Sequence, residues 1–262
     1  MSLHRVRTVI LRHAYVLWRS PNRWFDIAFF PVMDVVLFGS LGTYAARQSH
    51  HSGAGVSFLL AGIMLFHVLF QVQVAMATGF MEETWSRNLL NVMVTPVTEV
   101  EYVAGLAIFG LFKLAFALVV LSVMAFGFFA FGLGQLGWAL VPVSAILIAA
   151  GWAIALVVIG MMLRFGQSAE ILTYGLNFMV LALSGVFYPV DALPGLIQPL
   201  ARALPTTHAF IAVRSVLAGH GLPGRELVAG TAGTAVLMAL AFAFVVHMLR
   251  VFRRKGLVTR FS

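Results

Sequence analysis

The sequence predicts an all-α membrane protein, and the prediction rests on its composition and on the length of its apolar runs. Of the 262 residues, 61% are hydrophobic and 10% are charged, whereas a soluble domain is about half apolar and about a quarter charged. The apolar residues occur in runs of roughly 20, the length that a helix needs to cross ~30 Å of hydrocarbon. These runs are continuous and do not alternate, which favours helices over strands.

The basic residues indicate a lipid surface as their partner. The net charge of +8 would point to nucleic acid in a soluble protein, but here the charges lie in short tails beside apolar runs. Lys and Arg at such positions hold helix ends at anionic lipid, so we expect membrane lipid and no nucleic acid. The chain has no cysteine, and its histidines lack metal-ligand spacing, so we expect no metal site.

The first 24 residues predict an amphipathic helix in the membrane surface. On a helical wheel, one face is apolar and the opposite face is basic, the pattern of an interfacial helix. A break follows at Ser20-Pro21-Asn22. The apolar face consists of Leu3, Val6, Ile10, Ala14 and Leu17, and the basic face of Arg5, Arg12, Arg19 and Arg23.

A single transmembrane domain over 25–249 is predicted to contain six spans. The spans cover about 25–46, 55–80, 102–131, 138–163, 171–188 and 227–249. Thr98 and Glu101 have the spacing of a capping box at the start of the third span.

The segment 189–225 is largely apolar but is interrupted by prolines that include Pro189, Pro194, Pro199 and Pro205, so it is either a further span or a re-entrant pair of short helices. Five basic residues precede the first span and five follow the last, in the tail 250–262. The positive-inside rule then places both termini in the cytoplasm, which requires an even number of spans. We therefore expect an external re-entrant hairpin and cytoplasmic loops at 81–101 and 164–170.

The residue pattern of the loop 81–101 predicts that it contains a short amphipathic helix. Glu83 and Arg87 are spaced for an ion pair, and Trp85, Leu89 and Val92 form an apolar stripe. Such a helix either docks a soluble partner or rests on the lipid headgroups, and the periodicity favours neither.

Ionisable and polar side chains lie inside the predicted spans. Asp34 and Lys113 are costly there unless they pair or face a common aqueous cavity, and a structural ion pair is favoured over a substrate- or proton-sensing site. His67, Gln71, Gln73 and Asn177 either line a polar route or, as is more usual, bond to neighbouring helices.

Two phrases resemble the type-2 ABC exporter permeases. They are RNLLNVMVTPVTEVEYVAG at 87–105, after the second span, and LSGVFYPVDALPGLIQPLARALPTTH at 183–208. In that family the second phrase covers the end of the fifth span and the external hairpin. The resemblance assigns to this hairpin Ser184, Gly185, Pro189, Pro194, Pro205 and His208.

The resemblance also implies partners. Two permease chains, expected as a homodimer, would each dock a cytoplasmic ATPase subunit through the 81–95 helix and the N-terminal helix, with substrate leaving between the protomers near the first and fifth spans. This chain has no phosphate-binding loop, so ATP and Mg would bind to the two ATPase copies, and no cofactor or catalytic residue is expected here. The expected coupling residues are Glu82, Glu83, Trp85, Arg87 and Asn88.

The expected function is therefore that of an exporter permease in the bacterial inner membrane, with a drug, a lipid or a lipid-linked oligosaccharide as its amphiphilic cargo. The alternative is an ion-coupled secondary transporter that uses Asp34 and Lys113. A membrane-embedded enzyme is disfavoured, because the loops contain no cluster of His, Asp or Ser.

Overall fold

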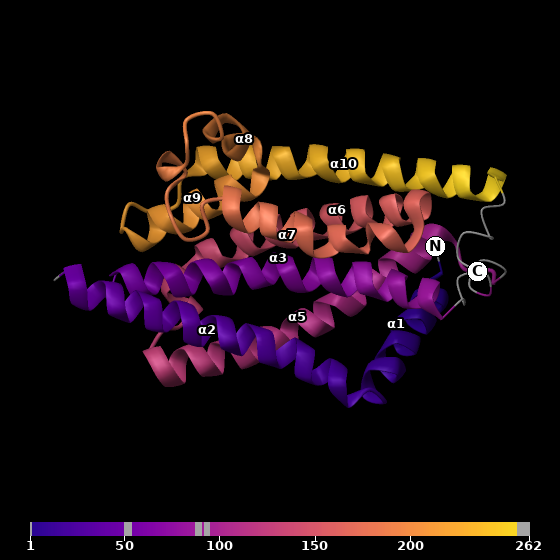
Figure 1. The fold of residues 1–262 in the computed structure, drawn as a ribbon, viewed down its shortest axis with the longest axis horizontal. Helices are drawn as coiled ribbons and strands as arrows, with labels where there is room; N and C mark the ends of the chain where they lie inside the picture. Colours follow the sequence, from indigo (N-terminus) through magenta and orange to yellow (C-terminus); the bar gives the residue numbers. More distant parts are fainter. Residues whose placement is uncertain (1, 50–53, 87–90, 92–94, 256–262) are drawn as a thin grey trace.

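The computed structural model describes residues 2–49, 54–86, 91 and 95–255, and every regular element in these ranges is helical (Figure 1). The α-helices are α1 (Leu3–Trp18), α2 (Pro21–Ser49), α3 (Ala54–Trp85), α5 (Glu99–Phe129), α6 (Leu140–Phe165), α7 (Ile171–Leu183), α8 (Gln198–Ala203), α9 (Pro205–Leu217) and α10 (Gly224–Lys255). Three 3-10 helices join them: η1 (Leu133–Ala139), η2 (Gly166–Glu170) and η3 (Val190–Ala192).

Five helices in the described chain are long and apolar enough to cross a membrane. They cover Arg23–Arg47, Val56–Trp85, Glu99–Phe129, Leu133–Phe165 and Gly224–Val251. The predicted fifth span, 171–188, is too long, because α7 ends at Leu183. With 13 residues, α7 is about 20 Å long at 1.5 Å per residue, and it stops where Gly185 takes a left-handed φ of 69°.

The long helices form a bundle in which α3 and α6 are central. About 78% of the most apolar window of α3 and 67% of that of α6 are buried, against 22–33% for the other three. Helices α2, α5 and α6 pack on α3, while α10 packs on α6. A helix that is apolar on all sides is expected in such a central position, and the outer helices present apolar faces to the surroundings.

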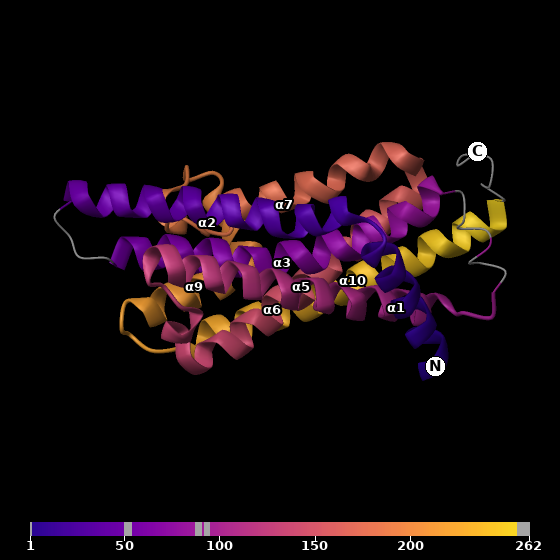
Figure 2. The same cartoon turned by 90° about the horizontal axis from the view of Figure 1, so that it is seen from below.

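Helix α1 and the C-terminal end of α10 lie at the same end of the bundle, and α8 and α9 lie at the opposite end (Figure 1 and Figure 2). The segment 189–225 forms the short helices η3, α8 and α9 instead of one long helix. Pro205 begins α9 at a position where proline costs no helical hydrogen bond. The sequence left two conformations possible for this segment, a further span or short helices, and the structure shows short helices.

The N-terminal helix packs on α5 along part of its predicted apolar face, and its place in the membrane surface stays a prediction. The break at 20–22 is confirmed, since α1 ends at Trp18 and α2 begins at Pro21. The buried stripe, however, is Val6, Val9, His13 and Leu17, and it faces α5. Leu3, which was expected on the apolar face, is 81% exposed, because the wheel identifies an apolar side but not the neighbour that covers it.

The capping box at the start of α5 is confirmed. The Thr98 hydroxyl accepts a hydrogen bond from the Glu101 backbone N–H, and the Glu101 carboxylate accepts one from the Thr98 backbone N–H. Glu101 also accepts a hydrogen bond from the backbone N–H of Ser2 at 2.6 Å, which joins α5 to the start of α1.

Thr98→Ala is expected to destabilise the first turn of α5 by about 1 kcal/mol, the usual cost of losing such a cap. The measurement is the midpoint of unfolding of the purified chain in detergent, which should fall. Ser86→Ala is the control, because the Ser86 hydroxyl bonds only to carbonyls of its own helix. An unchanged midpoint in Thr98→Ala would show that the cap does not stabilise α5.

Candidate functional site

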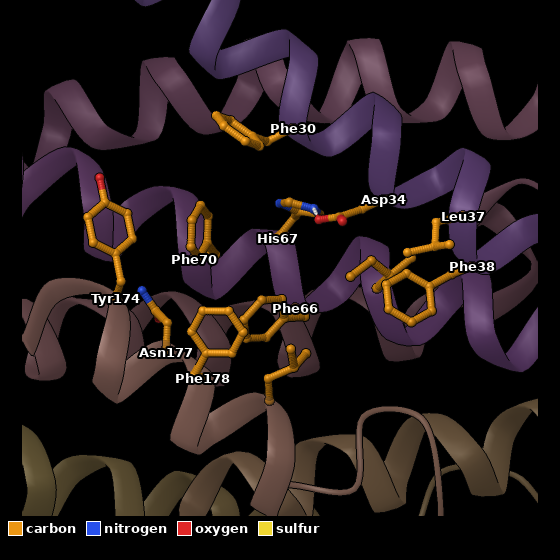
Figure 3. A pocket seen from close by; sticks show the side chains of 12 residues that line it. Phe30, Asp34, Leu37, Phe38, Phe66, His67, Phe70, Tyr174, Asn177 and Phe178 are labelled. Carbon is orange, nitrogen blue, oxygen red and sulfur yellow. Dashed lines mark hydrogen bonds and ion pairs between the residues drawn. The ribbon is translucent and has the colours of Figure 1, made fainter. Parts of the chain in front are cut away.

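A pocket of about 560 Å³ lies between α2 and α7, with α3 as its floor (Figure 3). Each of the three helices contributes four of the lining residues. Phe30, Leu37 and Phe178 stand at its mouth, since 59%, 60% and 70% of their surfaces are exposed. The lining residues are Phe30, Asp34, Leu37, Phe38, Ile63, Phe66, His67, Phe70, Tyr174, Asn177, Phe178 and Leu181.

Asp34 and His67 meet across this pocket. The Oδ2 atom of Asp34 on α2 lies 2.9 Å from Nε2 of His67 on α3 (Figure 3). The His67 side chain is almost fully buried, while the Asp34 side chain is 37% exposed. Asp34 therefore has His67 as a partner, and the expectation that Asp34 and Lys113 pair or face a common aqueous cavity stays a prediction.

Lys113 lines a second pocket, of about 370 Å³, that adjoins the first. Phe30, Phe70 and Tyr174 border both pockets, so the two cavities share these three rings. The other polar residues of the second pocket are Arg23, Gln71, Thr78 and Glu82.

The buried amides of the spans bond between helices, as the usual behaviour of such residues suggests. The Asn177 side-chain N–H group donates to Gln73 Oε1 at 2.5 Å and to the Thr173 carbonyl at 2.9 Å. Gln71 donates to the Ile27 carbonyl at 3.5 Å. Asn177 and Gln71 also line the pockets, so the two interpretations of these residues are compatible.

A cluster of ion pairs joins α1 and the start of α2 to the end of α3. Arg12 Nη2 lies 2.7 Å from a carboxylate oxygen of Glu83, and Arg23 Nη1 lies 2.7 Å from one of Glu82. Glu83 is only 2% exposed. We call Arg12, Arg23, Glu82 and Glu83 the charged clamp.

The charged clamp changes the interpretation of the loop 81–101. Its first five residues continue α3 to Trp85 and do not begin a separate helix. Glu82 and Glu83 face α2 and α1, whereas Trp85 is 48% exposed. Arg87 and Asn88, and with them the predicted pair of Glu83 with Arg87, lie outside the described residues.

His13 lies beside the charged clamp without adding a charge to it. Burial lowers the pKa of its imidazole from 6.5 to about 4, and the Glu83 carboxylate only partly opposes this shift. The ring packs on Phe109 at 5.6 Å between centroids. At neutral pH Arg12, which is 41% exposed, is a cationic partner of Glu83, whereas the uncharged His13 ring is not.

The predicted hairpin residues are held by contacts among the short helices. The Ser184 hydroxyl bonds to that of Thr206 at 2.6 Å, and the Gly185 carbonyl accepts from Arg214 at 3.0 Å. His208 Nδ1 lies 2.6 Å from the Glu226 carboxylate. Pro189 and Pro194 accept backbone hydrogen bonds from Ala192 and Ile197 in the turns.

Sequence reasoning missed the aromatic lining of the pocket and the role of Arg12. Phe66 and Phe70 are spaced i, i+4 on α3 and Tyr174 and Phe178 on α7, so each pair shares a helix face. This spacing is visible in the sequence and could have predicted an aromatic face on each helix. Arg12 could not be found in this way, because its partner is 71 residues away.

Long apolar helices indicate a multi-pass membrane protein, and a pocket whose lining is half Phe and Tyr lies between them. Residues 4–218 match the model of a family described as ABC-2 type transporter. The match covers most of the chain, and the chain belongs to this family as its membrane permease component, which is not itself catalytic. A search of curated proteins gives no match.

Proposed function

We propose that the chain is the membrane-spanning subunit of an ATP-driven exporter of an amphiphilic substrate. The observation that carries the proposal is the charged clamp, in a family whose permeases normally work with an ATPase subunit. It fixes α1 to the end of α3 beside the exposed Trp85. Motion imposed there would pass directly into α3, which forms the floor of the pocket.

The ATPase is proposed to dock at this end of the bundle in two copies, which bind ATP and Mg. Trp85 offers an exposed apolar anchor, and Glu82 is partly exposed. Arg87 and Asn88 are also proposed to contact the ATPase. Glu83 is buried by Arg12, so its proposed role is to transmit movement to α1 without touching the ATPase.

A second copy of the chain is proposed to pack against the α2 side of the pocket. This face carries exposed large apolar side chains that include Phe25, Phe29, Phe30, Met33, Leu37 and Leu41. In a homodimer the two pockets would face a common path near the first and fifth spans. Basic residues flank both ends of the chain, which supports cytoplasmic termini and a place in the bacterial inner membrane.

The competing candidate is an ion-coupled secondary transporter that uses Asp34 and Lys113. A carboxylate that lines a pocket within the bundle is the observation in its favour. Against it, Asp34 is paired with His67, and Lys113 lines the adjoining pocket. The two candidates differ in their energy source, since the secondary transporter requires no ATPase.

The test is affinity purification of the tagged chain from its native membranes. We expect a nucleotide-binding ATPase to co-purify, and Trp85→Ala to reduce its amount at least about tenfold, as for an interface hot spot. Trp138→Ala is the matched control, because Trp138 is 90% exposed on η1, after the far end of α5. Purification without an ATPase would contradict the proposal, and equal loss in both variants would contradict docking at Trp85.

A further inference from the structure

The described lining of the pocket between α2, α3 and α7 is rich in aromatic side chains and contains an acidic but no basic one. Six of its twelve lining residues are Phe or Tyr, and the described lining includes no Lys or Arg. Asp34 is its one acidic side chain. A cavity of about 560 Å³ lies within the range that holds drug-sized ligands.

The contact between Asp34 and His67 leaves the pocket with a negative charge. His67 uses Nε2 toward Asp34, and its Nδ1 atom is buried without a hydrogen-bond partner. An imidazolium would place a charged N–H at that position with nothing to accept it, which is costly in a buried site. The geometry therefore favours a neutral ring that donates from Nε2 to an ionised Asp34.

Asn177 contributes an amide to the wall of the same pocket. The Asn177 Oδ1 atom, also buried in the wall of the pocket, has no hydrogen-bond partner. The described lining contains no Lys or Arg side chain. The carboxylate itself is 37% exposed, so it is available to a ligand that enters the pocket.

We infer that this pocket binds lipophilic organic cations, that is, molecules with a largely aromatic body and a single positive charge. The ring faces would attract the cation through their quadrupoles, and Asp34 would neutralise its charge where water is scarce. The inference rests on the proposed function, because it names the class of substrate that the exporter moves.

Anionic and carbohydrate cargoes fit this lining less well. An anion would meet the ionised Asp34 with no Lys or Arg in the described lining to compensate it. A sugar headgroup needs several polar partners. The polar side chains here are Asp34, His67, Asn177 and Tyr174, and all four already interact with the protein or with each other.

The test compares two ions of the same shape and opposite charge. Binding of tetraphenylphosphonium and tetraphenylborate to the full chain in phosphatidylcholine nanodiscs is measured, with empty nanodiscs subtracted. We expect the chain to bind the phosphonium at least about tenfold more tightly than the borate. Asp34→Asn should weaken phosphonium binding at least about tenfold, whereas Asp191→Asn, which changes a carboxylate that is 78% exposed on η3, should not.

A second pair of variants tests the aromatic wall. Phe178→Ala should weaken phosphonium binding, and Phe128→Ala should not, because Phe128 is similarly exposed but lies outside this pocket. If Asp34→Asn fails to fold, Asp34→Glu keeps the charge and should keep phosphonium binding, and the Phe178 variant then decides. Equal affinity for the two ions, or equal binding by the Asp34→Asn and Asp191→Asn variants, would overturn the inference.

The two proposals fail separately. If the chain binds the phosphonium selectively but no ATPase co-purifies, the cation-binding pocket is supported and the exporter proposal is contradicted. If an ATPase co-purifies but the chain shows no preference for the phosphonium, the exporter proposal is supported and the proposed substrate class is contradicted.

Discussion

Arg12→Ala is expected to release α1 from the end of α3 and to uncouple ATP hydrolysis from transport. Arg12 lies 2.7 Å from Glu83, which is almost fully buried. Removing the guanidinium leaves the carboxylate without this partner, a change that costs 3–5 kcal/mol in fully buried pairs. Because Arg12 is 41% exposed, solvent screens the pair, and we expect a smaller loss of stability of about 2 kcal/mol.

His13 does not compensate for the loss of Arg12. Its Nε2 atom is 3.9 Å from Glu83, but its lowered pKa of about 4 keeps it uncharged at neutral pH. Amide hydrogen exchange in α1 should become roughly 30-fold faster, which is what a 2 kcal/mol loss of local stability gives. Arg7→Ala, which changes an exposed arginine of the same helix, should leave exchange unchanged. Equal exchange in the two variants would show that the clamp does not hold α1.

Gly62→Ala is expected to prevent close packing of α3 against the turn that follows α7. A Cβ atom at residue 62 would clash with the backbone carbonyl oxygen of Val186. A carbonyl oxygen cannot move away as the tip of a side chain can, so the helix or the turn must shift. Overpacking of this kind costs about 3 kcal/mol, and the midpoint of unfolding and the yield of monodisperse protein should both fall.

Gly127→Ala is the matched control for this prediction. Gly127 lies in α5 with no atom within 4 Å of the added Cβ, and alanine favours a helix by about 1 kcal/mol over glycine. This variant should be as stable as the parent or more so. If Gly62→Ala matched it, the close approach of Gly62 to Val186 would not be required by the fold.

The sequence predicts local structure well, because local structure depends on neighbouring residues. Apolar runs locate the long helices, the break at Ser20-Pro21-Asn22 separates α1 from α2, and Thr98 with Glu101 forms the expected capping box. The end of α7 was placed too late, because apolar composition continues past Leu183 although the helix does not.

The sequence does not predict which helix faces meet. Asp34 and His67 are 33 residues apart, and their contact depends on the rotation of α2 against α3. The same is true of Arg12 and Glu83. Helical periodicity fixes which residues share a face, but the register between two helices follows from packing along their whole length.

The most direct test of the account is the mass of the complex purified from native membranes, measured by native mass spectrometry. We predict two copies of the 28.5 kDa chain together with two copies of an ATPase that binds ATP and Mg. A chain that leaves the membrane with no nucleotide-binding partner would contradict the account.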